Sequence, residues 1–438
     1  MKKTFTVLIV LTVLTAFTVS VFIVINPVDK SYGYNHQKHR GKTANTLRLS
    51  ILIKNALKNP HIASSVLKTE GRGEEITIAK ALPEPVAGIG FTDANGFNNP
   101  GIGVNSMSDI GLSISQKIPF PSKLETKSRI NKYSYMSSKA KTRALKIDTV
   151  YLVKETYYNL ALVERQAVTI KFDRFLLNII LNDISQKYGT GSVSAPAYIR
   201  TMLEEAALKS ELYSLNNVKA KLIYLLSELT GFEPSYIKSR RAVLPKIKGS
   251  GKGAETKKDI KTAYKYNPEL KSLKYLAQKS DYETAYAKES YLPDFYLKAG
   301  YGDRYSMVPV LSASVGLSLP VYFNSYQKPL INKAEKDKLS SIYAISWERL
   351  QIIKNIGVYA KDLRINKNNF KLYENLYVPE AKLLFKAEIS SFGTGKSSAF
   401  SLLDSFRKLI DSEFKRDIYN AKYYIDKSRL EQVMGKIR

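Results

Sequence analysis

The residues that could support catalysis or metal binding are few in this sequence and lie far apart. The chain has no cysteine, which excludes thiolate catalysis, disulfides and cysteine-ligated zinc. Its histidines, His36, His39 and His61, lie near the amino terminus without a cluster of carboxylates beside them. Imidazoles without such partners are a poor metal site. We therefore expect no catalytic residue, no bound metal and no cofactor, and the chain is not predicted to be an enzyme.

Two segments rich in glycine and lysine resemble phosphate-binding loops only in part. Gly249–Gly253 lacks the spacing Gly-x-x-x-x-Gly-Lys-Ser/Thr, and no buried strand precedes it. Gly393–Ser397 ends in Gly-Lys-Ser, but the first glycine is missing and a helix is predicted before it. A nucleotide site is therefore not predicted. The first segment falls within 246–261, which we interpret as a mobile basic linker, with anion binding as the less favoured alternative.

The sequence is strongly basic, with 68 Lys and Arg against 39 Asp and Glu in 438 residues and a formal net charge of +29. Such a charge fits nucleic acid, an anionic membrane surface or anionic cargo as partners. It also fits helix faces that simply contact water. The hydrophobic content of 44% excludes wholesale disorder.

The amino terminus has the pattern of an export signal. Two lysines precede an uncharged apolar run, Thr4–Ile25, of about 22 residues. We predict a signal peptide over 1–25 and a flexible segment over 26–44. Because the run could also span a bilayer, an uncleaved anchor is the competing interpretation. Export in either form argues against a nucleic-acid partner.

After residue 45 the sequence repeats itself at an offset of about 200–210 residues, which indicates a duplicated unit. Each half has an Asn-Pro helix start, two strand-like segments, a strand end before proline, a long helical stretch and a Gly-Thr-Gly turn. We predict a first repeat over 45–231, a linker over 232–266 and a second repeat over 267–438.

Each repeat combines short strands with unusually long helices. In the first repeat we predict a helix over 60–81, strands near 86–93 and 108–118, a long helix over 122–188 and a helix over 197–230. In the second we predict a helix after Pro268, strands near 294–302 and 309–319, a long helix over 325–391 that Pro379 should kink, and a helix over 398–434. A helix of about 66 residues is about 100 Å long, so these helices must pack side by side in a coiled-coil-like bundle.

The predicted strands alternate apolar residues with small or polar ones, as in Val86–Phe91 and Leu311–Leu317. This alternation is typical of transmembrane β-strands. Four strands cannot close a barrel, and lipid does not tolerate an open sheet edge, so several chains would have to contribute. The alternative is a pair of soluble hairpins at the end of a helical bundle.

This order of elements resembles the TolC-type outer-membrane efflux family of Gram-negative bacteria, over residues 45–433. The segments that carry the resemblance are Ala81–Pro85, Ser115–Leu124 and Tyr291–Phe295. The second is similar to the heavy-metal-exporter branch, although Ser122 stands where a glycine is common. The resemblance implies a mainly α fold with four transmembrane β-strands per chain. A homotrimer would then form a twelve-stranded barrel and a twelve-helix tunnel.

The resemblance also implies where the tunnel narrows. In relatives, acidic residues just after the second tip turn form the constriction; Asp404 matches one such place, and Ser401 occupies the other. Arg200 is the equivalent of Asp404 in the first repeat. We therefore expect a reduced acidic ring and an Asp404–Arg200 contact between neighbouring helices. The alternative for Asp404 is an ordinary solvated helix position.

Glycines mark both predicted tip turns, where the long helix passes to its partner. We expect them to adopt positive φ angles, which other residues resist. By analogy with the family, they are candidates for contact with an adaptor: Gly189, Gly191, Gly393 and Gly395.

The resemblance, together with these observations, implies a passive exit duct in the outer membrane that extends into the periplasm. It would release small molecules or metal ions delivered by an inner-membrane transporter of the RND or ABC type through a periplasmic adaptor. One alternative keeps the fold and assigns type I protein secretion. Another is an inner-membrane-anchored periplasmic adaptor or scaffold, which requires an uncleaved Thr4–Ile25 segment. If enough of the positive charge faces the lumen, the duct should favour anions.

Overall fold

The computed structural model describes residues 46–92, 108–191, 194–247, 256–304, 307–394, 396–397 and 399–436. The predicted signal peptide, the segment 26–44 and part of the basic linker lie outside the described residues. The chain forms two compact units. We call Pro60–Leu145 with Tyr266–Ile352 the sheet unit, and Met1–Asn59 with Lys146–Lys265 and Ile353–Arg438 the tip unit. Each unit draws on both sequence repeats.

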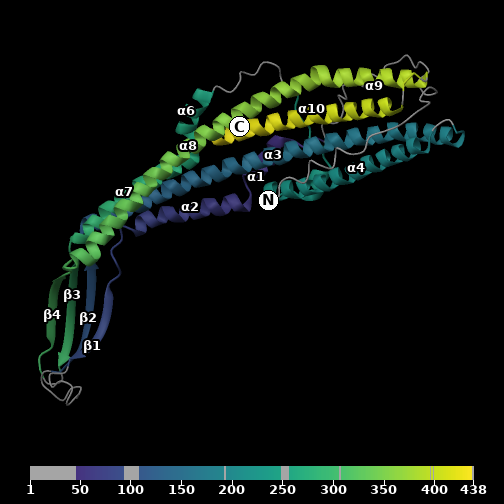
Figure 1. Cartoon of the computed structure of the whole chain (residues 1–438). Helices are drawn as coiled ribbons and strands as arrows, with labels where there is room; N and C mark the ends of the chain where they lie inside the picture. Colours follow the sequence, from purple (N-terminus) through teal and green to yellow (C-terminus); the bar gives the residue numbers. More distant parts are fainter. Residues whose placement is uncertain are drawn as a thin grey trace. The chain divides into compact units, whose positions relative to one another are not determined.

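The sheet unit contains a four-stranded antiparallel sheet of order β1-β2-β3-β4 (Figure 1). The strands are β1 (Val86–Thr92), β2 (Asp109–Ile118), β3 (Phe295–Arg304) and β4 (Val310–Leu317). Their positions agree with the four predicted segments. β2 pairs with β3 from Asp109↔Arg304 to Ile118↔Phe295, so the centre of the sheet joins the two sequence repeats.

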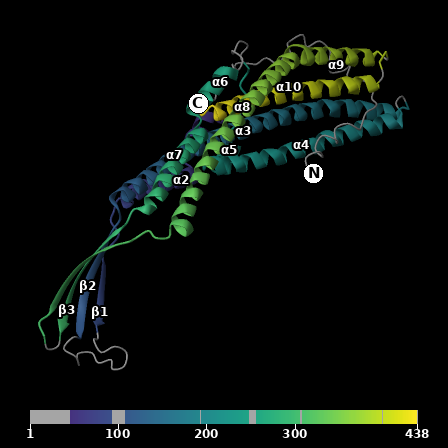
Figure 2. The ribbon, with the colours of Figure 1, turned by 60° about the vertical axis from the view of Figure 1, so that its left-hand side comes forward.

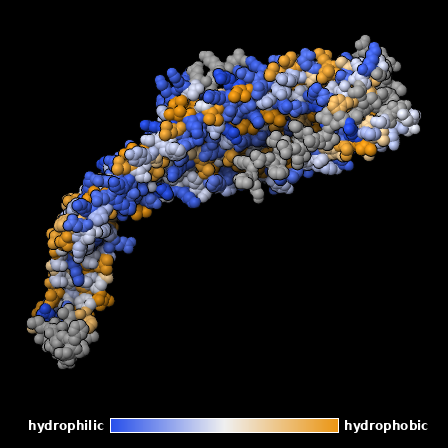
Figure 3. All heavy atoms as spheres, in the orientation of Figure 1, coloured by the Kyte–Doolittle hydropathy of each residue, from blue (hydrophilic) through white to orange (hydrophobic). Residues whose placement is uncertain are grey.

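The strand register places most apolar residues on one face of the sheet and most small or polar residues on the other. One face carries Ala87, Ile89, Phe91, Ile110, Leu112, Ile114, Leu297, Ala299, Tyr301, Leu311, Ala313 and Val315. The other carries Gly88, Gly90, Ser113, Ser115, Lys298, Gly300, Ser312 and Ser314. The apolar face is open: Ile89, Leu311 and Val315 are 81%, 84% and 73% exposed. Figure 3 shows hydrophobic residues at the surface over the strands.

Small residues on the polar face let neighbouring strands fit closely. A Cβ added at Gly300 in β3 would lie 2.8 Å from the Ser312 hydroxyl and 3.4 Å from the Leu112 carbonyl oxygen. A Cβ added at Gly90, on the same face, would meet no atom within 4 Å. We expect Gly300→Val to destabilise the protein by about 1–3 kcal/mol through overpacking. Urea unfolding in detergent, followed by circular dichroism, checks this. Equal loss in Gly90→Val would contradict the steric explanation.

Among the described residues, four α-helical segments belong to the sheet unit, and the strands lie at one end of them (Figures 1 and 2). They are α2 (Pro60–Ile78), the start of α3 (Pro121–Gly189), α7 (Pro268–Lys288) and the start of α8 (Lys328–Leu372). A short 3₁₀ turn, Glu289–Tyr291, separates α7 from β3. α2 is shorter than predicted and ends at Ile78 instead of 81.

Asp294 fastens the sheet to the helices of this unit. Its carboxylate pairs with Lys123 of α3 at 2.7 Å and with Lys117 of β2 at 3.0 Å, and it accepts the Phe120 N–H at 3.3 Å. Phe120 also stacks on Phe295, with ring centroids 6.5 Å apart. Two of the segments that carry the family resemblance, Ser115–Leu124 and Tyr291–Phe295, therefore meet at this junction.

The tip unit is mainly helical in its described residues, with one isolated parallel β-bridge between Thr46 and Arg241. It contains α1 (Leu49–Ala56), the remainder of α3, α4 (Ala195–Thr230), α5 (Pro234–Lys238), most of α6 (Thr256–Tyr266), the end of α8, α9 (Val378–Gly393) and α10 (Ala399–Val433). In both ribbon views α3, α4, α9 and α10 run side by side (Figures 1 and 2). No described helix in either unit is long and apolar enough to cross a membrane.

Two features of the helices differ from the sequence expectation. The predicted linker 232–266 contains α5 and α6, and α6 begins at Thr256 inside the segment expected to be mobile. Ala263 of α6 is fully buried. The predicted helix 325–391 begins with a π-helical turn, Phe323–Gln327, and is divided by a second, Tyr373–Tyr377. The second turn ends two residues before Pro379, which has no N–H for the regular helical hydrogen bond.

Candidate functional site

The α3–α4 and α9–α10 connections lie at the same end of the tip unit (Figure 2). We call this end the helix tips. The four helices share a core here, with Phe406, Leu177 and Ile184 fully buried. Because each pair of helices is joined by only a few residues, the tips hold both predicted turns and every predicted constriction residue.

Asp404 lies on α10 and is partly exposed. Its carboxylate pairs with Lys408, one turn along the same helix, at 2.6 Å. Arg200 is exposed on α4, and Ser401 is half-buried on α10. Within one chain, therefore, the expected Asp404–Arg200 contact is replaced by Asp404–Lys408. An ion pair inside a single helix does not hold two helices together.

The ion pair that does link α4 to α10 lies one turn farther along both helices. The Arg407 guanidinium donates two hydrogen bonds to Glu204, one of them at 3.1 Å. The Glu204 side chain is only 7% exposed. Its neighbour Glu205 accepts two bonds from Arg174 of α3, one at 3.1 Å. The adjacent carboxylates thus tie α4 to two different helices, which the sequence interpretation did not anticipate.

The tip turns use glycine less than expected. Gly191 has the predicted positive φ, at 72°. The same expectation is wrong for Gly189 and Gly393, because each is the last residue of a helix, α3 and α9 respectively. Gly395 lies outside the described residues. An unpredicted contact helps to close the first turn: Tyr188 and Tyr198 stack with ring centroids 5.4 Å apart.

A buried carboxyl group lies among the same four helices. Asp173 of α3 is 5% exposed, and its Oδ2 has no hydrogen-bond partner among the described residues. Burial, together with the nearby carboxylates of Glu413 on α10 and Glu211 on α4, raises the pKa of Asp173 to about 7. This carboxyl group therefore titrates near neutral pH.

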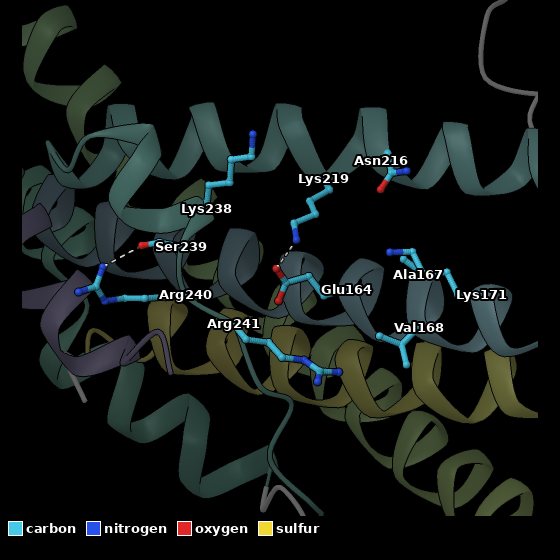
Figure 4. A pocket seen from close by; sticks show the side chains of 10 residues that line it. All are labelled: Glu164, Ala167, Val168, Lys171, Asn216, Lys219, Lys238, Ser239, Arg240 and Arg241. Carbon is cyan, nitrogen blue, oxygen red and sulfur yellow. Dashed lines mark hydrogen bonds and ion pairs between the residues drawn. The ribbon is translucent and has the colours of Figure 1, made fainter. Parts of the chain in front are cut away.

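A basic cleft of 440 Å³ lies elsewhere in the tip unit, between α3, α4, the end of α5 and the residues after it (Figure 4). Its charged lining residues are Lys171, Lys219, Lys238, Arg240, Arg241 and Glu164. Figure 4 shows Lys219 reaching from α4 to Glu164 on α3, at 2.8 Å. The other carboxylate oxygen of Glu164 accepts the Ala242 N–H at 2.9 Å. Glu164 therefore fastens the segment after α5 to the helices.

We expect Glu164→Ala to destabilise the protein by about 2–4 kcal/mol, because it leaves the buried Ala242 N–H without its acceptor and Lys219 without its partner. The Glu164 side chain is 7% exposed, so water does not readily replace it. Chemical denaturation monitored by circular dichroism measures the change. Lys238→Ala, an exposed residue of the same cleft, should stay within about 0.5 kcal/mol of the parent. Similar losses in both variants would contradict the anchoring role.

The described residues contain no group of three His, Asp or Glu side chains that could hold a metal ion. The helix tips offer ion pairs between helices and a buried carboxyl group that can gain or lose a proton.

Comparison with solved structures identifies the fold. VceC, an outer-membrane protein of Vibrio cholerae, aligns over 88% of this chain and 96% of its own with a TM-score of 0.74 and 14% identity. The CmeC outer-membrane channel of Campylobacter jejuni aligns over 88% and 85%, with a TM-score of 0.76 and 13% identity. The open state of the MtrE outer-membrane channel of Neisseria gonorrhoeae aligns over 89% of both chains, with a TM-score of 0.68 and 15% identity.

No family model and no curated protein sequence matches the chain. At identities of 12% to 15% the likeness concerns the fold. The chain thus has the mainly α fold of the outer-membrane channels, with antiparallel strands and long helices, as the resemblance to the TolC-type family implied. The heavy-metal branch stays a prediction.

Proposed function

We propose that the chain is the outer-membrane exit duct of a tripartite efflux system in a Gram-negative cell. The observation that carries this proposal is the sheet, whose apolar face is exposed and whose outer strands, β1 and β4, each have one partner among the described strands. Such a face suits lipid, and such edges must be paired there. The fold shared with solved outer-membrane channels supports the same conclusion.

The unpaired edges favour a homotrimer. β4 of one chain would pair with β1 of the next, and three copies would give twelve strands, within the range of known closed barrels. The helices of three copies would then continue as a tunnel into the periplasm. Outer-membrane lipid would contact the apolar face of the sheet, and no nucleic-acid partner is required.

In this arrangement the helix tips would form the periplasmic entrance. Asp404, with Ser401 beside it and Arg200 on the adjacent helix, is proposed as the constriction, repeated three times around the axis. Gly189, Gly191, Gly393 and Gly395 mark the turns that a periplasmic adaptor would contact. An inner-membrane transporter of the RND or ABC type would supply the energy, and the duct would pass small molecules or metal ions passively.

Membrane fractionation with amino-terminal sequencing tests the proposal. We expect recovery of a cross-linkable trimer in the outer membrane, with an amino terminus beyond Ile25. Recovery in the inner membrane with Met1 intact would refute the duct and favour an anchored periplasmic adaptor or scaffold. A deletion strain separates small-molecule efflux from protein secretion. Its sensitivity to drugs and metals reports the first, and its set of secreted proteins reports the second.

A further inference from the structure

One stretch of α3 in the sheet unit contains basic residues and no acidic ones. Between Thr126 and Leu145 there is no Asp or Glu, and every Lys and Arg is exposed: Lys127, Arg129, Lys132, Lys139, Lys141 and Arg143. Arg129 pairs with Glu125 at 2.9 Å. The five others form no ion pair with the described residues. We call these five residues the α3 cations.

Among the described residues, no ion pair joins an acidic residue of α2, α7 or α8 to the α3 cations, and lysines of α8 hold two of these carboxylates. Lys338 of α8 pairs with Asp281 of α7 at 2.9 Å, and Lys333 pairs with Asp337 within α8 at 2.7 Å. In Figure 3 the visible surface over the helices of this unit is mainly hydrophilic. α3 is therefore a source of net positive charge along this part of the protein.

Two opposite sides of α3 are occupied by neighbouring helices. On one side, Thr142 bonds to Thr69 of α2 at 2.9 Å. On the other, Ser137 bonds to Ser272 of α7 at 2.8 Å, and Tyr133 stacks on Tyr282 with ring centroids 5.4 Å apart. In a tube made of such helices, each helix has a neighbour on either side, one face toward the interior and one toward the exterior.

The α3 cations cover both of the faces that remain. Lys132, Lys139 and Arg143 are separated by seven and four residues, so they share one face. Lys127 and Lys141 are fourteen residues apart and share the opposite face, alongside Ser134, which bonds to Arg72 of α2. Whichever face of α3 is turned inward, cations project into the interior.

We propose that the α3 cations make this duct selective for anions, and that its cargo is small organic anions bearing carboxylate or phosphate groups. This inference rests on the proposed function, since it requires a tube of several copies. Rings of Lys and Arg are the device by which pores select anions. On the face with Lys132 and Lys139, two rings would lie about 10 Å apart along the helix. Hydrated, mobile lysine side chains would attract an anion at successive positions and release it again.

Reversal potentials in planar lipid bilayers test this inference on the full-length protein. Under a KCl gradient near 1 M, the Debye length is about 3 Å, so only charges that border the pore act on the ions. We expect the parent protein to prefer chloride over potassium. The two charge-reversal variants are K132E/K139E/R143E and K127E/K141E. Because only one face borders the interior, each variant is the matched control for the other.

We expect one variant to shift the reversal potential toward the equilibrium potential of potassium and the other to leave it unchanged. Conductance by benzoate and by a phosphate monoester should fall in the same variant. Preference of the parent for potassium, or equal behaviour of the two variants, would overturn the inference and leave the duct intact. Absence of any conductance, together with recovery outside the outer membrane, would instead count against the proposed function.

Discussion

Replacing Asp173 by asparagine should stabilise the protein at pH 8 by about 2–4 kcal/mol, although a buried carboxyl group is removed. The asparagine has the shape of the protonated acid but never ionises, so it avoids the cost of placing a charge among apolar side chains. Asp173 is 5% exposed, and its Oδ2 accepts no hydrogen bond from the described residues. Nothing there offsets the lost hydration of the ionised form.

The pH dependence follows from the same shift. The pKa of Asp173 rises from 3.8 in the unfolded chain to about 7 in the fold, mainly because of burial and then because of Glu413 and Glu211. Between pH 4 and pH 7 the folded state holds more protons than the unfolded state. The free energy of unfolding contributed by this group therefore falls as pH rises through that window. Above pH 7 the destabilisation is complete.

Unfolding in urea at pH 5 and pH 8 measures the effect. The loss of stability between pH 5 and pH 8 should be larger in the parent than in the Asp173→Asn variant. Asp411→Asn provides the control. Asp411 lies on α10, is largely exposed and pairs with Lys415, so its replacement should change the free energy of unfolding by less than about 0.5 kcal/mol. An unchanged pH slope in Asp173→Asn would mean that water reaches the carboxylate in the assembled protein.

The large elements of this fold could be predicted because their signals are long. Glycine and proline are absent over most of α3, and apolar residues alternate with other residues along whole strands. A single unfavourable residue does not hide patterns of this length. Strand pairing across the repeats, with Asp109 opposite Arg304, could not be read from either strand alone. Division of the predicted helix 325–391 was foreseeable at Pro379, yet the π-helical turn at Phe323 has no comparable sequence signal.

The residues that hold the helix tips together were harder to predict. The family resemblance points to Asp404, and the repeat places Arg200 at the equivalent position, but helix rotation decides which side chains meet. The structure brings together Glu204 and Arg407 instead, one turn away. Glu204 occupies a core-facing position of α4. Because acidic residues are rarely buried without a partner, a carboxylate at such a position indicates a buried ion pair. Choosing its partner requires knowing which helices are adjacent.

Replacing Glu204 by alanine should loosen the helix tips and raise single-channel conductance if the chain forms the proposed duct. Glu204 is the acceptor of both Arg407 bonds and is nearly inaccessible, while Arg407 is 26% exposed. After the substitution the Arg407 guanidinium can reach water. We therefore expect the free energy of unfolding to fall by about 1–3 kcal/mol, which is less than the cost of a fully buried unpaired charge. α4 would lose its bidentate bond to α10 and keep its bond to α3 through Glu205.

Thermal unfolding and bilayer recordings on one set of variants separate this contact from the proposed constriction. Glu204→Ala should lower stability and raise conductance. E204R/R407E reverses the ion pair, so it should return both stability and conductance part of the way to the parent values. Asp404→Ala removes a carboxylate whose described ion pair is with Lys408 on the same helix, so stability should change by less than about 0.5 kcal/mol. A rise in conductance in Asp404→Ala without loss of stability would then report a ring formed between chains. Unchanged conductance in Glu204→Ala would show that α4 and α10 stay together without this ion pair, because the apolar contacts of Phe406 and Leu208 suffice.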